Sequence, residues 1–284
     1  MTGTGPHEIA ARRRAFRALH ERPGIFVMPN PWDIGTARIL AALGFEALAT
    51  SSAALAVGLG RADNTTSRAE AIAHARTMVE ATGLPVNGDL EAGYGREASE
   101  VVETIRGAID FGLAGCSIED ATGDRREPLF EIGHSAARIR AARQAIDRAG
   151  VDFMLTARAE CFLTGQSEPL KEAIHRLRAY ESEGAHVVYA PGVTSEDQIA
   201  EIVAAVKVPV NVLGGTGKAP LPVAKLAELG VKRVSLGPRL FQTAMTAFLA
   251  ASQELKDRGT FGFMRETAPL APVYEILKDQ EKSA

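Results

Sequence analysis

Three carboxylates lie at the ends of two neighbouring apolar runs of the chain. Asp89 ends the run Pro85–Asp89, Glu91 follows two residues later, and Glu119 ends the run Gly115–Glu119. Carboxylates that converge resist ionisation unless a cation lies among them, and oxygen-rich sites suit Mg²⁺ or Mn²⁺. We predict that the three side chains bind Mg²⁺, with Mn²⁺ as the alternative ion. The competing interpretation is that they cap helices or form salt bridges.

A cation ends the next run. Arg158 closes the run Phe153–Arg158, and an arginine there can bind a substrate carboxylate through two parallel hydrogen bonds. The alternative is a buried ion pair with Glu160 or Glu119, and the two interpretations are compatible. A small organic acid is therefore the predicted substrate.

Polar residues end other runs as well. Ser51 and Ser52 follow the second run, where they could hold a carboxylate or a phosphonate, or cap a helix. Asn30 follows the first run, and Asp63 lies in the long loop after the second. Asn211 lies in the seventh run before a glycine-rich turn, but no complete nucleotide-binding motif is present. We assign Ser51, Ser52, Asn30 and Asn211, with Arg158, to substrate binding.

Eight short apolar runs alternate with amphipathic segments and would position these residues. Such runs are typical of buried parallel strands, and eight strand–helix units favour a closed (β/α)8 TIM barrel with its site at the carboxyl ends of the strands. The runs are Ile25–Met28, Ala47–Thr50, Pro85–Asp89, Gly115–Glu119, Phe153–Arg158, His186–Ala190, Val208–Leu213 and Lys232–Leu236.

Helix signals surround these runs. An opening helix over Pro6–His20 could close the bottom of the barrel, and Ser67, Ser135 and Ser195 are candidate N-caps. Two helices are predicted after the eighth run, at Leu240–Arg258 and Phe263–Lys278. A barrel needs only one, so the extra helix favours packing on a neighbouring subunit in a homo-oligomer.

Composition limits the class of protein. The 284 residues carry a net charge of −3 and are 46% hydrophobic, which gives no sign of a nucleic-acid partner. Two cysteines, no apolar signal segment and no long apolar stretch indicate a cytoplasmic chain that does not span a membrane. We predict one barrel domain over residues 1–284, with 240–284 as a helical extension.

Several segments together resemble the isocitrate lyase/phosphoenolpyruvate mutase superfamily. They are MPNPWDIGTARIL, TSSAALAVGLGRADN, GDLEAGYG, SIED and TARAE, within about residues 26–241. The resemblance implies a (β/α)8 barrel, commonly a homotetramer, that exchanges a C-terminal helix between subunits. It implies Mg²⁺ bound at Asp89, Glu91 and Glu119, with Asp63 acting through water. Residues matching Ser51, Ser52 and Arg158 hold the substrate carboxylate.

Two departures from the superfamily bear on the substrate. Its isocitrate and methylisocitrate lyases carry a Lys-[Lys/Arg]-Cys-Gly-His loop after the fourth strand, where this chain has ATGDRREPLFEIGHS. They also carry a tyrosine where this chain has Ala49. Both missing groups transfer protons, which typically contribute about 10²–10⁴ in rate each. An isocitrate lyase activity is therefore not expected.

The predicted activity is an Mg²⁺-dependent carbon–carbon lyase acting on a small 2-oxo or 2-hydroxy acid through an enolate. Cleavage would be a decarboxylation or a retro-aldol reaction, with Arg158, Asp63 and Glu119 as the catalytic set. The loop with Arg125, Arg126 and His134 could close as a lid. The alternatives are a phosphonopyruvate-type mutase or hydrolase, and a barrel that binds a 2-oxo acid without converting it.

Overall fold

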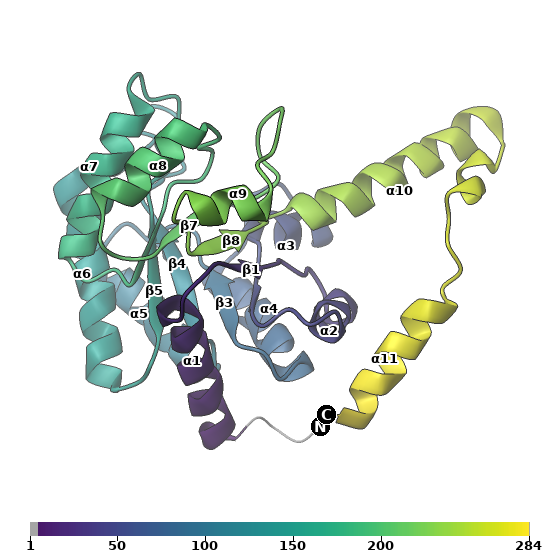
Figure 1. The fold of residues 1–284 in the computed structure, drawn as a ribbon, viewed down its shortest axis with the longest axis horizontal. Coiled ribbons are helices and arrows are strands. Elements are labelled where there is room, and N and C mark those ends of the chain that lie inside the picture. Colours follow the sequence, from purple (N-terminus) through teal and green to yellow (C-terminus); the bar gives the residue numbers. More distant parts are fainter. Residues whose placement is uncertain (1–4, 284) are drawn as a thin grey trace.

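In the computed structural model, eight parallel strands form one barrel-shaped sheet (Figure 1). The structure describes residues 5–283, with side chains up to residue 278. Each predicted run contains one strand, so all eight strand predictions are confirmed. The strands are β1 (Phe26–Met28), β2 (Leu48–Ala49), β3 (Val86–Asp89), β4 (Gly115–Glu119), β5 (Met154–Arg158), β6 (Val187–Tyr189), β7 (Val210–Leu213) and β8 (Arg233–Ser235).

Backbone and side-chain hydrogen bonds close the barrel between its first two strands. The sheet order is β1-β8-β7-β6-β5-β4-β3-β2, so β1 and β2 are its two ends. Ala49 N donates to Pro29 O at 3.0 Å. Asn30 Nδ2 donates to Thr50 O at 2.7 Å, while Asn30 Oδ1 accepts from the two backbone N–H groups that follow β8, at 2.9 Å each. The predicted (β/α)8 barrel is confirmed.

Helices separate consecutive strands and cover the outside of the sheet. Short α3 begins directly after β2, and its first turn lies beside the site. The helices between strands are α2 (Ile34–Ala42), α3 (Ser52–Gly58), α4 (Arg68–Ala81), α5 (Ala98–Asp110), α6 (Ile132–Ala149), α7 (Pro169–Ser182), α8 (Glu196–Ala205) and α9 (Val223–Glu228).

The predicted caps have different outcomes. Ser67 caps α4 and forms a reciprocal capping box with Glu70, as predicted. Ser195 is the N-cap residue of α8, although its side chain makes no capping hydrogen bond. The prediction for Ser135 is wrong. The N-cap of α6 is Glu131, four residues earlier, whose side chain accepts from His134 N, and Ser135 lies buried inside the first turn.

Helix α1 (Pro6–Glu21) closes the amino-terminal end of the barrel, as expected. Phe16 and Leu19 pack in one apolar cluster with residues near the starts of several strands, among them Phe26 and Met154. A Cβ on Gly115 would lie 3.0 Å from the ring of Phe16 and 2.5 Å from Met154 O, so glycine is required at this contact. The barrel is therefore open only at its carboxyl end.

The last helices leave the barrel (Figure 1). They are α10 (Arg239–Arg258), the 3₁₀ turn η1 (Gly262–Arg265) and α11 (Ala271–Ser283). The predicted start at Phe263 is wrong, because the Glu254 carboxylate binds the N–H groups of η1 and Pro269 cannot continue a helix. α11 packs against α2 of the same chain, and exchange between subunits stays a prediction.

No helix within residues 5–283 is long and apolar enough to cross a membrane. The assignment of residues 1–284 to one domain, with 240–284 as an extension, stays a prediction, and its residues 1–4 and 284 lie outside the described part of the chain.

Candidate active site

A cavity of about 280 Å³ opens at the carboxyl ends of the strands. This is the end of a TIM barrel where active sites lie. Most of the predicted site residues line it, namely Asn30, Ser51, Ser52, Asp63, Asp89, Arg158 and Asn211. Glu91 and Glu119 are not among its lining residues.

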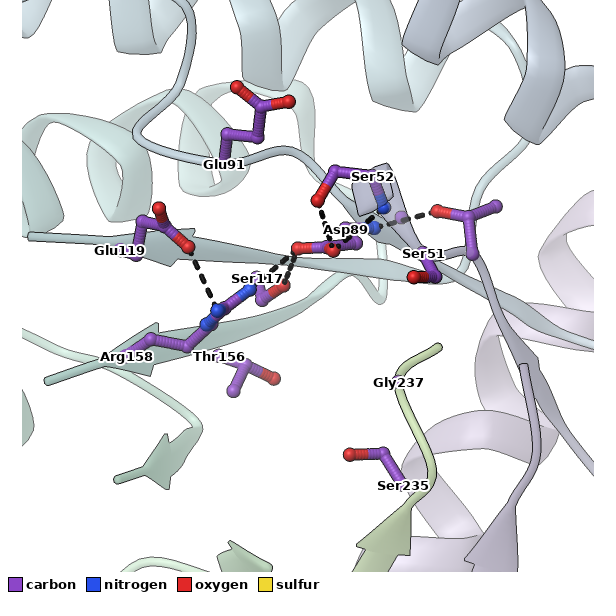
Figure 2. A network of polar contacts seen from close by, with 12 residues as sticks. Ser51, Ser52, Asp89, Glu91, Ser117, Glu119, Thr156, Arg158, Ser235 and Gly237 are labelled. Carbon is purple, nitrogen blue, oxygen red and sulfur yellow. Dashed lines mark hydrogen bonds and ion pairs between the residues drawn. The ribbon is translucent and has the colours of Figure 1, made fainter. Parts of the chain in front are cut away.

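Arg158 is the centre of a buried ionic cluster on one wall (Figure 2). Its Nη1 lies 2.7 Å from Asp89 Oδ1, and its Nη2 lies 2.9 Å from Glu119 Oε2. Glu160 Oε1 is 2.9 Å from both Nε and Nη2. Adjacent strands produce this geometry, because Glu119 and Arg158 are directly paired in the β4–β5 register. The ion-pair interpretation of Arg158 is therefore confirmed for both Glu119 and Glu160, and its binding of a substrate carboxylate stays a prediction.

Burial opposes the charge of Arg158, yet the carboxylates of Glu119, Glu160 and Asp89 raise its pKa well above the ordinary value. A guanidinium has five N–H donors, and one hydrogen of Nη1 has no acceptor among the described residues. Arg158 therefore keeps a donor for a ligand oxygen.

Glu91 lies apart from the ionic cluster. Its backbone φ of 48° is in the left-handed region, which non-glycine residues seldom adopt. Figure 2 shows its carboxylate pointing away from Asp89 and Glu119, and Oε1 accepts from Thr66 Oγ1 at 2.9 Å. Burial, with smaller contributions from the nearby Asp89 and Asp63, raises the pKa of Glu91 to about 7.

The predicted metal ligands are near one another but do not converge on one point. Among the side chains described, those of residues 5–278, no three histidine, cysteine or acidic groups are placed together as metal ligands. Arg158 lies between Asp89 and Glu119, and Glu91 turns away from both, so the role of these three residues as metal ligands stays a prediction.

The charge balance nevertheless fits a divalent cation. Five acidic side chains and one guanidinium share this wall, and burial raises the pKa of Glu119, of Glu91 and of Asp63. Such a surplus of negative charge favours a further cation, and the donors are all oxygens, as Mg²⁺ prefers. The acidic side chains are Asp63, Asp89, Glu91, Glu119 and Glu160.

The two serines lie at the start of α3. Ser52 donates to Asp89 Oδ2 through both its backbone N–H and its hydroxyl, at 3.0 Å each. Ser51 Oγ accepts from Ala54 N at 3.3 Å and so caps the helix, which was the alternative interpretation. Because this bond uses only a lone pair, the Ser51 hydroxyl hydrogen can still be donated to a ligand.

The two predicted asparagines are held tightly. Asn30 is bound to three backbone groups at the barrel closure and retains one N–H. Asn211 donates to Ser235 Oγ at 2.9 Å and accepts from Arg233 Nε at 2.9 Å. Their role in substrate binding stays a prediction.

The loop after β4 lies away from the cavity. His134 is in the first turn of α6, and its Nε2 is 2.8 Å from Arg96 O. The loop itself is closed by an antiparallel bridge between Ala121 and Leu129, and Arg126 N donates to Asp124 within it. None of these residues lines the cavity. Their role as a lid stays a prediction.

Comparison with known proteins decides the family. The sequence profile of the phosphoenolpyruvate phosphomutase family matches residues 16–256. The chain belongs to this family. A solved structure from Burkholderia cenocepacia J2315, provisionally described as a lyase/mutase, is 47% identical to this phosphomutase-family chain and superposes with a TM-score of 0.91. The match covers 94% of this chain and 96% of that one.

Other relatives of this phosphomutase-family chain have named activities. Oxaloacetate decarboxylase from Paraburkholderia xenovorans (strain LB400) is 32% identical over 88% of this chain and 83% of its own length. The structure of oxaloacetate acetylhydrolase with its product oxalate is 26% identical, with a TM-score of 0.83, over 97% and 96% of the two chains. The predictions of the superfamily and of an enzyme are confirmed, and the relatives support cleavage or rearrangement of a bond to carbon.

Glu160, which the ion-pair interpretation of Arg158 named, is the third partner of that guanidinium. Two arginines at this phosphomutase-family site were given no role in the sequence analysis. Arg233 lies inside the barrel with 1% of its surface exposed. Arg239, the first residue of α10, lines the cavity from the opposite side. Its position after β8 is the only sequence signal.

Proposed function

We propose that this chain is an Mg²⁺-dependent lyase that cleaves a carbon–carbon bond of a small 2-oxo or 2-hydroxy acid through an enolate. One observation carries the proposal. A cluster with more carboxylates than cations borders a cavity of about 280 Å³ at the catalytic end of the barrel.

Asp89, Glu91 and Glu119, the ligands that the superfamily resemblance implies, would hold the ion, and Asp89 contributes to the raised pKa of both glutamates. When bound, Mg²⁺ would act as a Lewis acid that withdraws electron density from the substrate oxygens. It would also add the positive charge that this group of acids lacks. Asp63, at the same wall, would act through a water molecule, as the superfamily resemblance implies.

The chain's own donors would orient the substrate. The remaining Nη1 hydrogen of Arg158 and the hydroxyl hydrogen of Ser51 would donate to one end of the acid. The free N–H groups of Asn30 and Asn211 would donate to its other oxygens. Arg158 would then stabilise the negative charge that develops as the bond breaks. Decarboxylation of a 2-oxo diacid needs no base to start, so the absence of a tyrosine at Ala49 does not prevent it.

Phosphonate chemistry is the second candidate, since the matched family profile is that of phosphoenolpyruvate phosphomutase. The two are separated by one assay. Wild-type protein with Mg²⁺ is incubated with 2-oxo and 2-hydroxy diacids and with phosphonopyruvate, and the products are identified by mass spectrometry. Pyruvate-type products that disappear with a chelator support the lyase, whereas phosphate or phosphoenolpyruvate supports the alternative.

Asp89→Ala tests the metal site directly. The substitution removes the carboxylate that contacts both Ser52 and Arg158, and we expect Mg²⁺ binding measured by calorimetry to be abolished. Asp197→Ala, at an exposed position in α8, is the matched control and should bind Mg²⁺ like the wild type. Unchanged Mg²⁺ affinity in Asp89→Ala would remove the metal assignment. We also propose that the enzyme is a cytoplasmic homo-oligomer. Both cysteines are free and buried, which supports a reducing compartment.

A further inference from the structure

The two walls of the cavity differ in charge. On the Arg158 wall, three carboxylates surround one guanidinium, so the charge there is negative. The opposite wall is formed by the end of β8 and the start of α10, which Figure 2 shows facing Asp89 across the cavity at Ser235 and Gly237. Arg239 is the charged residue of this second wall, and Arg233, on β8, lines the cavity from the interior of the barrel.

Arg233 places inside the barrel a positive charge that no acid balances. Its guanidinium binds Asn211 Oδ1 at 2.9 Å, Thr156 Oγ1 at 2.9 Å and His20 Nε2 at 3.2 Å, which are all neutral partners. It forms no ion pair among the described residues. Burial lowers its pKa to about 9, so it remains charged at neutral pH.

Arg239 is the cation that can reach a ligand. It is the first residue of α10 and is partly exposed at the cavity. Its Nη1 donates to Gln242 Oε1 at 2.9 Å, which orients the guanidinium, and Gln242 lines the same cavity. Its buried Nε has no hydrogen-bond partner, and no carboxylate lies within ion-pair distance among the described residues. Most of its donors are therefore unused.

We infer that Arg239 is a specificity-determining residue that binds a second anionic group of the substrate, on the wall opposite Arg158. The inference rests on the proposed function, which places the 2-oxo or 2-hydroxy acid end at the Arg158 wall. The planar guanidinium suits a carboxylate or a phosphonate, since both accept two parallel hydrogen bonds. The positive charge of Arg233 behind Asn211 favours either anion.

Three probes that share one end test this inference, each titrated with Mg²⁺ by calorimetry. They are 2-hydroxysuccinate, 2-hydroxy-3-phosphonopropanoate and 2-hydroxybutanoate, which ends in a methyl group. The variants are Arg239→Gln and, as a matched control on the same helix, Arg258→Gln at an exposed position. In Arg239→Gln we expect the preferred charged probe to bind about 10- to 100-fold more weakly, because a charged hydrogen-bond partner is lost.

The outcomes separate the inference from the proposed function. Unchanged binding of 2-hydroxybutanoate alongside the weaker binding of a charged probe supports the inference, and the tighter charged probe identifies the group as carboxylate or phosphonate. Equal weakening of all three probes, or equal affinity of wild-type protein for charged and methyl probes, overturns the inference alone. Wild-type protein that binds none of the probes overturns the proposed function and the inference with it. Arg258→Gln should match the wild type throughout.

Discussion

Arg158→Gln removes the guanidinium that Asp89, Glu119 and Glu160 share. The side chains of all four residues are at most 16% exposed, so water screens the remaining carboxylates poorly. Removing one partner of a buried ion pair typically costs about 3–5 kcal/mol. We expect the free energy of unfolding at neutral pH to fall by this amount, a large share of the stability of a typical domain.

The loss should depend on pH with a definite sign. Burial already raises the pKa of Glu119, and Arg158 opposes that shift, so the variant should raise it further. A carboxyl group with a raised folded-state pKa binds its proton more tightly when folded. Such a group stabilises the fold fully at a pH below its unfolded-state pKa. This stabilisation is lost as the pH rises through its folded-state pKa. Arg158→Gln should therefore be less destabilised at about pH 5 than at about pH 7.5.

Urea unfolding followed by circular dichroism at both pH values measures the effect. The double variant Arg158→Gln/Glu119→Gln should recover more than about 1 kcal/mol of the loss, because one uncompensated charge is removed. Arg140→Gln is the matched control, since it breaks an ion pair with Glu183 on the surface and should cost at most about 1 kcal/mol. A loss below about 1 kcal/mol in Arg158→Gln, or an equal loss at both pH values, would refute the reasoning.

Two further predictions concern the frame of the barrel. His20 is buried, and burial and Arg233 lower its pKa to about 3, so the unfolded chain takes up the proton first as the pH falls below about 6.5. Protonation of His20 should therefore lower the free energy of unfolding by about 1.4 kcal/mol for each pH unit between about 6.5 and 3. His20→Gln should remove this pH dependence in urea unfolding, and an unchanged pH dependence contradicts the assignment. Asn30→Ala leaves Leu236 N and Gly237 N without their acceptor. It should lower the free energy of unfolding by about 2–4 kcal/mol, and thermal denaturation within about 0.5 kcal/mol of the wild type would disprove this.

Much of the fold could be predicted because burial leaves a clear pattern in the sequence. Strands of a parallel barrel are covered on both faces, so each is a short apolar run. Helix starts were harder to predict, because several residues near the true start can cap. Before α6, Glu131 and Ser135 both have suitable oxygens, and only the tertiary packing that buries Ser135 decides between them.

The site could be predicted where neighbouring strands bring residues together. Asp89, Glu119 and Arg158 end three adjacent strands, so their proximity follows from strand order. The direction of Glu91 could not be predicted, because it depends on a left-handed backbone conformation at a non-glycine residue. Arg233 was also missed, since an arginine within an apolar run gives no sign that its partners, His20 among them, are neutral.

The barrel closure at Asn30 has a consequence for synthesis of the chain. Its amide carbonyl binds N–H groups 206 and 207 residues further along, so these contacts cannot form until the eighth strand has left the ribosome. Contacts this distant in sequence form late and slow folding. Until then the edge of β1 that pairs with β8 is open in the nascent protein, and water must satisfy an amide carbonyl that the finished barrel buries.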